Sequence, residues 1–127
     1  MKNRVRFYIC EKCGNLVHVI NDSGVNPVCC GQKMKELVVG EVEASHEKHI
    51  PVVTVDGCKV NIRIGSIDHP MSAEHSILWV YVEGERGGLL RYLNVGDEPA
   101  VELCLKGDKP VAVYAYCNLH GLWKKEI

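Results

Sequence analysis

Two soft metal ligands stand close together near the end of the chain, in the stretch CNLHG. A tight turn there can bring the sulfur of Cys117 and an imidazole nitrogen of His120 to one metal ion. Two donors do not hold a metal, so further donors must come from elsewhere in the sequence. Histidines next to prolines are suitable, because proline stiffens the backbone and so preserves the geometry of a site.

Two other segments carry such histidines, SHEKHIP (residues 45–51) and DHPMSAEHS (residues 68–76). With CNLHG they supply five candidate donors: His49, His69, His75, His120 and Cys117. A closed structural zinc site takes four ligands, whereas five donors leave one octahedral position vacant. The set therefore suits Fe(II) with an open face for a small anion. Its single thiolate is expected to donate electron density to the iron.

A second group of thiols lies in the first 30 residues, in CEKCG and CCG. Its members are Cys10, Cys13, Cys29 and Cys30. Four thiolates favour a tetrahedral iron or zinc ion, and ligand type alone does not distinguish the two metals. Neighbouring side chains of an extended backbone point apart, so the chain at Cys29 and Cys30 must bend and the tetrahedron is expected to be distorted. A disulfide between these two is the alternative, but it leaves the other pair without a function.

The remaining histidines and cysteines are not expected to bind metal. His18 lies within an apolar stretch, and His46 stands three residues before His49, where it could compete with it as a ligand. Cys58 and Cys104 lie in strand-like runs and are expected to be small buried residues.

Composition narrows the class of protein. The formal net charge is −1, which gives no general reason to expect nucleic acid or an anionic membrane as a partner. No apolar run approaches the ~18 residues of a membrane span, and the start of the chain lacks an apolar segment of signal-peptide length. The seven cysteines are odd in number and favour metal binding in a reducing compartment. We therefore expect a cytoplasmic protein with no membrane or nucleic-acid partner.

The pattern of elements predicts two domains. The first region reads as the strands RFYIC and NLVHVI with tight turns between them, and the chain changes from net positive to net negative near residues 36–45. Beyond that boundary, VVTVDGCKVNIRIG predicts a hairpin with Asp56-Gly57 as its turn. HSILWVYVE, GLLRYLNV, AVELCL and VAVYAYC follow at intervals of about ten residues, a rhythm typical of an antiparallel sandwich or barrel. The predicted domains are residues 1–38 and 39–127.

Together these motifs resemble the desulfoferrodoxin family, the two-iron form of superoxide reductase. CEKCG with CCG resembles a desulforedoxin-type Fe(Cys)4 motif, and EKHIP, HPMSAEH and CNLHGLW resemble the motifs of the catalytic iron site. The resemblance implies a desulforedoxin-like, rubredoxin-type first domain and an immunoglobulin-like antiparallel β-sandwich. It also implies four equatorial histidine ligands with Cys117 as the axial ligand. Lys48 would attract the anionic substrate, and Glu47 would bind the ferric iron after turnover.

The activity that the resemblance implies is the one-electron reduction of superoxide to hydrogen peroxide. Rubredoxin or a similar small protein would supply the electron, and the family implies a homodimer. Two other functions remain open on the residues alone. A zinc-ribbon-like head on a β-sandwich would recognise nucleic acid or protein, and a pure electron carrier would use only the four-cysteine centre. The electron carrier leaves the five-donor set unexplained.

Overall fold

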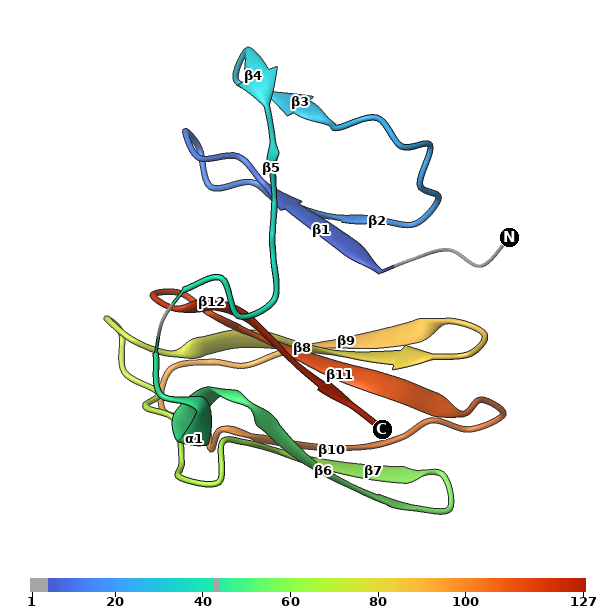
Figure 1. Cartoon of the computed structure of the whole chain (residues 1–127). Helices are drawn as coiled ribbons and strands as arrows, with labels where there is room; N and C mark the ends of the chain where they lie inside the picture. The colour runs from blue at the N-terminus through green and yellow to red at the C-terminus, as the bar shows by residue number, and fades with distance from the viewer. Residues whose placement is uncertain (1–4, 43) are drawn as a thin grey trace. The chain divides into compact units, whose positions relative to one another are not determined.

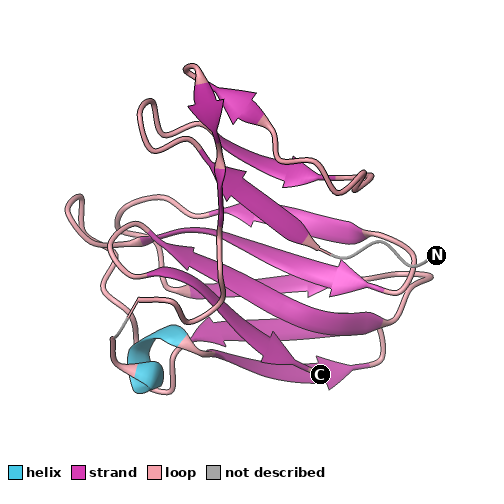
Figure 2. Ribbon diagram, turned by 45° about the horizontal axis from the view of Figure 1, so that its top comes forward, coloured by secondary structure: helices cyan, strands magenta, loops and turns pink. Residues whose placement is uncertain are grey.

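Strands form nearly all of the regular secondary structure in a computed structural model that describes residues 5–42 and 44–127 (Figures 1 and 2). The chain divides into two compact units, Met1–Val38 and Val39–Ile127. Residue 43, within the boundary segment expected from the sequence, lies outside the described residues. In the described part of the chain no helix is long and apolar enough to cross a membrane. The predicted mainly-β fold is confirmed.

The first unit is built from five short strands. They are β1 (Arg6–Ile9), β2 (Leu16–Val19), β3 (Val28–Cys29), β4 (Gln32–Lys33) and β5 (Lys35–Glu36). Strands β2, β1 and β5 form one antiparallel sheet in that order, and β3 pairs with β4. Among the described residues its buried cluster consists of Tyr8, Cys10 and Met34, with Val17, Val19 and Cys29 packed against it. So small a core favours a unit that a bound metal helps to stabilise.

The second unit contains one turn of helix and seven strands. They are α1 (His46–His49), β6 (Pro51–Asp56), β7 (Lys59–Ile64), β8 (Ile77–Gly84), β9 (Gly88–Tyr92), β10 (Ala100–Cys104), β11 (Pro110–Cys117) and β12 (Gly121–Glu126). One sheet has the order β10-β7-β6 and the other β12-β11-β8-β9, with every pair antiparallel. Seven antiparallel strands in two sheets match the predicted immunoglobulin-like sandwich.

Alternating apolar residues hold the two sheets together. In β7, Val60, Ile62 and Ile64 are buried, and in β11 Val113, Ala115 and Cys117 are buried. These residues belong to one cluster that also receives side chains from β8 and β10. A two-residue period puts one face of each strand into the core. The same pattern places Cys117, at the end of β11, at the edge of this core with its thiol fully buried.

The β6–β7 hairpin is confirmed, but its turn lies one residue later than predicted. Asp56 pairs with Lys59, so Gly57 and Cys58 form the two-residue loop. Gly57 has φ +61°, so of these two residues it alone lies in the left-handed region. A glycine first in a two-residue loop is typical of a type II′ turn, in which the first residue alone takes a positive φ.

The expectation that Cys58 and Cys104 are small buried residues is wrong. Both are exposed, and they form a disulfide with Cα atoms 4.9 Å apart. The register of β7 and β10 explains the pairing: Cys104 lies opposite Lys59, and the N–H of Leu105 donates to the carbonyl of Cys58. The bond therefore links the tip of one hairpin to the end of its neighbouring strand.

Candidate metal centres

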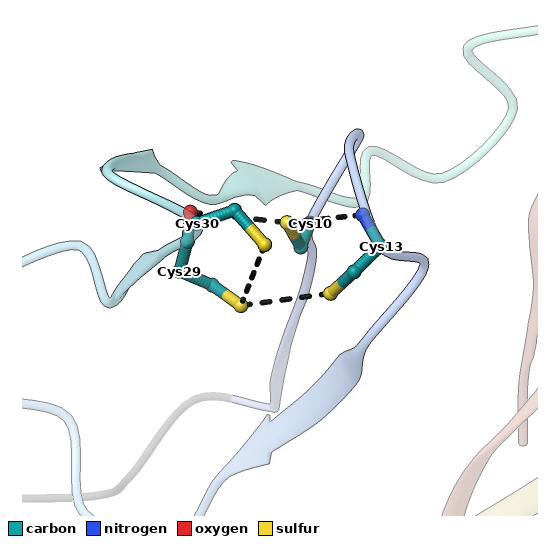
Figure 3. A group of neighbouring side chains, drawn as sticks. All are labelled: Cys10, Cys13, Cys29 and Cys30. Carbon is teal, nitrogen blue, oxygen red and sulfur yellow. Dashed lines mark hydrogen bonds between the residues drawn. The ribbon is translucent and has the colours of Figure 1, made fainter.

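Four cysteine side chains of the first unit point toward one another from two loops (Figure 3). The ligand atoms of Cys10, Cys13, Cys29 and Cys30 all lie within 4.8 Å of one another. The Sγ atoms of Cys13 and Cys29 are 3.7 Å apart, and those of Cys29 and Cys30 are 4.0 Å apart. Sulfurs about 2.3 Å from a tetrahedral ion are about 3.8 Å apart. The arrangement therefore fits one tetrahedral metal ion.

The bend expected at the adjacent cysteines is present. Cys30 has φ +52°, and among the described residues it is the only one besides glycines with a positive φ. This left-handed conformation turns the Cys30 thiol toward the same side as Cys29. The separation of their sulfurs exceeds that of Cys13 and Cys29, as a distorted tetrahedron requires.

The pKa values of Cys10 and Cys30 are shifted in opposite directions. Hydrogen bonds from the backbone N–H groups of Cys13 and Lys12 lower the pKa of Cys10 to about 6. Hydrogen bonding among the neighbouring thiols, to Cys13 above all, raises the pKa of Cys30 to about 12. Negative charge on one sulfur disfavours ionisation of the next. A metal ion that binds here must therefore displace protons, which makes its affinity fall with falling pH.

The second group lies at one end of the sandwich, where loops between strands converge. The ligand atoms of His49, His69, His75 and Cys117 all lie within 4.8 Å of one another. His120 belongs beside them, because its Nδ1 is 3.1 Å from Nε2 of His49 and 3.9 Å from the sulfur of Cys117. The structure thus brings together all five candidate donors, from α1, the 65–76 loop and the β11–β12 turn.

The four imidazole rings form a square. Ring centroids are 4.6 Å apart for His49–His69 and His69–His75, and 4.9 Å apart for His75–His120 and His49–His120. The His49–His75 separation, 6.2 Å, is longer, as a diagonal must be. Neighbouring rings stand nearly perpendicular, with interplanar angles of 78–87°. This is the arrangement of four equatorial nitrogens around one centre.

The nitrogen atoms that face the centre are lone-pair acceptors. The Nδ1–H of His49 donates to the carbonyl of Ser45 at 2.6 Å, and that of His69 donates to the carbonyl of Pro70 at 2.7 Å. In a neutral imidazole the opposite nitrogen then carries a lone pair. Yet the two Nε2 atoms are only 3.1 Å apart. A cation between them removes this repulsion, and bonds of about 2.1 Å at right angles put two nitrogens about 3 Å apart.

Burial favours the neutral form of three of these histidines. It lowers the pKa of His69 to about 4, and it also lowers the pKa of His49 and His75. Nε2 of His75 is a buried atom without a hydrogen-bond partner among the described residues. An orphaned buried nitrogen is costly unless something outside the protein occupies its lone pair. A metal ion satisfies this atom and its three neighbours at once.

The Cys117 thiol is buried but not isolated from polar groups. Burial raises its pKa, and hydrogen bonds from the backbone N–H groups of His120 and Leu119 oppose that rise. These two donors point at the sulfur because Cys117 pairs with Gly121 and the three residues between them form a tight turn. The sequence did not reveal them, because they are main-chain groups. Hydrogen bonds of this kind tune a metal thiolate.

A glycine turn holds the helix that carries His49. Gly65 has φ +83°, and a Cβ there would lie 2.5 Å from the carbonyl oxygen of Glu47 and 2.7 Å from the carbonyl carbon of Lys48. The Gly65 N–H donates to the carbonyl of Ile50, and the Ile67 N–H donates to that of Glu47. Only glycine permits this close approach, so the turn fixes α1 against the end of β7.

Lys48 and Glu47 lie on exposed faces of the same helical turn. The positive charge of Lys48 contributes to lowering the pKa of both His49 and His75, so the ammonium lies within electrostatic range of the square. Glu47 instead lines a shallow groove with Pro51, Val53 and others, and its carboxylate is not part of the cluster of ligand atoms.

Trp123 is a further residue at this site, and its CNLHGLW motif gave no role for it. The buried indole stacks on the ring of His49 at 4.9 Å, and its Nε1–H donates to the carbonyl of His120. The indole also makes an edge contact with His46, which is not among the clustered ligand atoms. His18 lies in the first unit, where its ring packs on Phe7, and it belongs to neither group of ligand atoms.

Both parts of the chain match families of known proteins. A family model described as desulfoferrodoxin matches residues 41–126, and one described as the desulfoferrodoxin N-terminal domain matches residues 2–37. The chain belongs to the desulfoferrodoxin family. It is 42% identical to the desulfoferrodoxin of Nitratidesulfovibrio vulgaris, over 99% of each chain, and 40% identical to a desulfoferrodoxin homologue of Archaeoglobus fulgidus, over 98% of each.

The fold of this desulfoferrodoxin-family chain also matches a solved structure over nearly its whole length. The superoxide reductase of Treponema pallidum is 32% identical, and the match covers 99% of this chain and 100% of that one, with a TM-score of 0.82. The prediction of the family from four short motifs is therefore confirmed. The ligand role of each cysteine and histidine stays a proposal.

Proposed function

We propose that the chain is a superoxide reductase that catalyses one-electron reduction of superoxide to hydrogen peroxide. The square of four imidazoles with the Cys117 sulfur beside it supports this assignment most directly. Five donors around one centre leave a sixth position open to a small anion, which a closed structural zinc site does not offer. Similarity to the superoxide reductase of Treponema pallidum over nearly the whole chain supports the same reaction.

The metal at both centres is iron. Cys10, Cys13, Cys29 and Cys30 would hold one ion in the first unit, and His49, His69, His75, His120 and Cys117 would hold the other in the second. Bound at the second centre, Fe(II) supplies the electron that superoxide accepts, and the reduced product takes up two protons to leave as hydrogen peroxide. The hydrogen bonds to Cys117 set how strongly its thiolate donates charge.

Lys48 is the residue that attracts the substrate. Its exposed ammonium acts on the His49 and His75 sites electrostatically, so it presents positive charge at the edge of the square. The chain is slightly acidic as a whole, so this attraction must be local. Lys48 can also order the water that delivers protons to the product. Glu47 reaches the open position only if its side chain turns away from the groove that it lines.

The reaction consumes one electron per superoxide, so a donor must restore the ferrous state. We assign this task to rubredoxin or a similar small iron–sulfur protein, as the family resemblance implies. Rapid mixing with reduced rubredoxin checks this: its oxidation should keep pace with superoxide added in portions. No oxidation above the rate without the chain would contradict the assignment.

The family also implies a homodimer in the cytoplasm. Five cysteines that serve as thiolate ligands must remain reduced, which favours a reducing compartment. The Cys58–Cys104 disulfide favours the opposite and would have to persist there. Sedimentation equilibrium of the iron-loaded chain tests the dimer, for which the expected mass is twice 14.2 kDa. Fractionation of the source cells tests the compartment. A monomer or an exported protein would refute the respective part of this proposal.

The stoichiometry of product tests the activity. A reductase yields one hydrogen peroxide per superoxide consumed, whereas dismutation yields one per two. Reduced, iron-loaded protein mixed with a known amount of superoxide should therefore give a peroxide-to-superoxide ratio near one while reductant lasts. A ratio near one half, or no faster decay of superoxide than in buffer, would overturn the proposed function.

A further inference from the structure

His75 lies in the loop 65–76, which connects the end of β7 at Ile64 to the start of β8 at Ile77 and contains no strand of its own. His75 nevertheless occupies one corner of the square, 4.6 Å from His69 and 4.9 Å from His120 between ring centroids. Its own backbone N–H and carbonyl both bond to Ser72, which closes a turn within the same loop. That turn shapes the loop locally, but it does not attach the loop to the rest of the site.

The Met71 carbonyl, earlier in this loop, accepts from the Gly96 N–H at 2.9 Å. The part of the loop around His75 is attached to the β11–β12 turn through the side chain of Asn118. Its Oδ1 accepts from the N–H of Ser76 at 2.9 Å, and its Nδ2 donates to the carbonyl of Glu74 at 2.9 Å. The Asn118 N–H donates to the carbonyl of Ser76 at 3.2 Å. These contacts flank His75 on both sides. The orientation of the amide is fixed, because only one assignment of oxygen and nitrogen satisfies both partners.

The hydrogen bonds of Asn118 extend the pairing of β11 with β8 beyond its last residue pair, Cys117 with Ile77. Cys117 pairs with Ile77, and the pairing there shifts by one residue relative to Tyr116 with Trp79. The side-chain amide of Asn118 then takes the place of a backbone peptide and reaches two residues further along the loop. Ser76 is buried, with 3% of its surface exposed. Its N–H would be left unsatisfied if the amide were lost, which is the costly case.

We propose that Asn118 is a positioning residue for the second metal centre, which locks His75 to the turn that carries Cys117 and His120. Asn118 adjoins Cys117 in sequence, so one turn sets the sulfur, one imidazole and, through this amide, a second imidazole. The inference rests on the proposed metal site but not on the reaction performed there. Loss of the side-chain amide leaves only the backbone bond from Asn118 to Ser76 beside His75. The other four ligands keep their own supports.

The measurement is retention of the second iron by the full chain. Asn118→Leu removes both side-chain bonds, and Asn118→Asp keeps only the acceptor for Ser76. In both variants iron at the second centre should be lost to a chelator at concentrations about 10–100-fold lower than in wild type, the effect typical of groups that orient metal ligands. The effect should be larger for Asn118→Leu. The oxidised visible band of the second centre should shift or weaken, while the four-cysteine centre keeps its spectrum and so reports on folding.

Asn61→Leu is the matched control, because Asn61 lies in β7 among strand pairs and away from both centres. It should retain iron as wild type does. Hydrogen exchange of the Ser76 amide gives a second measurement, which does not depend on loss of the metal. The Ser76 N–H should be protected in wild type and in Asn118→Asp, and should exchange faster in Asn118→Leu.

Equal iron retention by wild type and both variants would overturn the inference alone. If Asn118→Leu does not fold, Asn118→Asp and the wild-type exchange of Ser76 decide the matter: an unprotected Ser76 amide in wild type contradicts the clamp. If wild type itself holds iron only at the four-cysteine centre, the proposed function fails together with the inference.

Discussion

At the scale of single residues, the chemistry depends on which atoms of each side chain are already hydrogen-bonded within the protein. His49 and His69 give their Nδ1–H groups to backbone carbonyls, so their Nε2 lone pairs are free to bind metal. His120 faces the centre with Nδ1 instead. The sequence predicts which residues meet, because cysteine and histidine at these spacings have few other uses. It does not predict which nitrogen is presented, since that choice follows from carbonyl groups of the fold.

Lys48 gives the sharpest prediction at this scale. Lys48→Ala should slow the bimolecular reaction with superoxide by about tenfold, because it removes local positive charge that raises the encounter rate. Lys48→Arg is the control and should retain most of the rate. Stopped-flow decay of superoxide at increasing ionic strength measures both. The wild-type rate should fall with salt and the alanine variant should respond less, and a salt-independent wild-type rate would contradict electrostatic attraction.

At the scale of elements, strands with an alternating pattern were predictable and short or polar elements were not. The continuous apolar runs that became β8 and β11, and the alternating run that became β7, are plain in the sequence. β12 ends in Lys124, Lys125 and Glu126 and lacks such a signal. Helix α1 is a single turn, too short for helical periodicity to show. The disulfide was missed for a related reason. Only the long-range register of β7 with β10 brings Cys58 to Cys104.

Substitution of Gly65 tests whether the turn after β7 positions α1 and its ligand His49. Gly65→Ala should lower iron at the second centre and leave the four-cysteine centre loaded, because the added Cβ collides with backbone of the turn that carries His49. Gly57→Ala, in the open β6–β7 loop, is the control: it also replaces a glycine of positive φ but meets no atom within 4 Å. Metal analysis of both variants decides. Full iron content in Gly65→Ala would show that α1 is not held by this turn.

The Cys58–Cys104 bond should stabilise the sandwich without affecting its chemistry. Replacing both cysteines with serine should lower the free energy of unfolding by about 2–5 kcal/mol, as loss of a native disulfide does. Six strand residues, Pro51–Asp56, separate the hairpin tip from the His49 end of β6, a distance of about 20 Å. The superoxide rate should therefore be unchanged. Denaturant unfolding and thiol titration check this, and two free thiols in the native protein beyond the five ligand cysteines would contradict the disulfide.

At the scale of the whole molecule, the two units are separately built around separate centres. The small core of Met1–Val38 includes Cys10, with Cys29 packed against it, whereas the second unit has a large apolar core of its own. The division was predictable from the crowding of cysteines before residue 31 and the β rhythm after residue 50. The relation of the two centres in electron transfer was not predictable, because it depends on long-range geometry that no local pattern encodes.

Cys13→Ser should therefore disable one centre only. The first unit should lose its iron and its ferric thiolate absorption, because three sulfurs and a hydroxyl bind iron more weakly than four thiolates. The second centre should keep its iron and reduce superoxide at close to the wild-type rate when a chemical reductant is supplied. Metal analysis and stopped-flow kinetics measure these effects. Parallel loss of activity would mean that the first centre is needed for the reaction.

The central claim is that four histidine nitrogens and the Cys117 sulfur hold one iron ion. Visible absorption of oxidised protein, with iron counted per chain, tests it most directly when wild type is compared with Cys117→Ser. Wild type should hold two irons and show a thiolate-to-iron band of the second centre on top of the four-cysteine spectrum. Cys117→Ser should lose that band and keep the four-cysteine spectrum unchanged. A second-centre thiolate band that persists in Cys117→Ser would contradict the account.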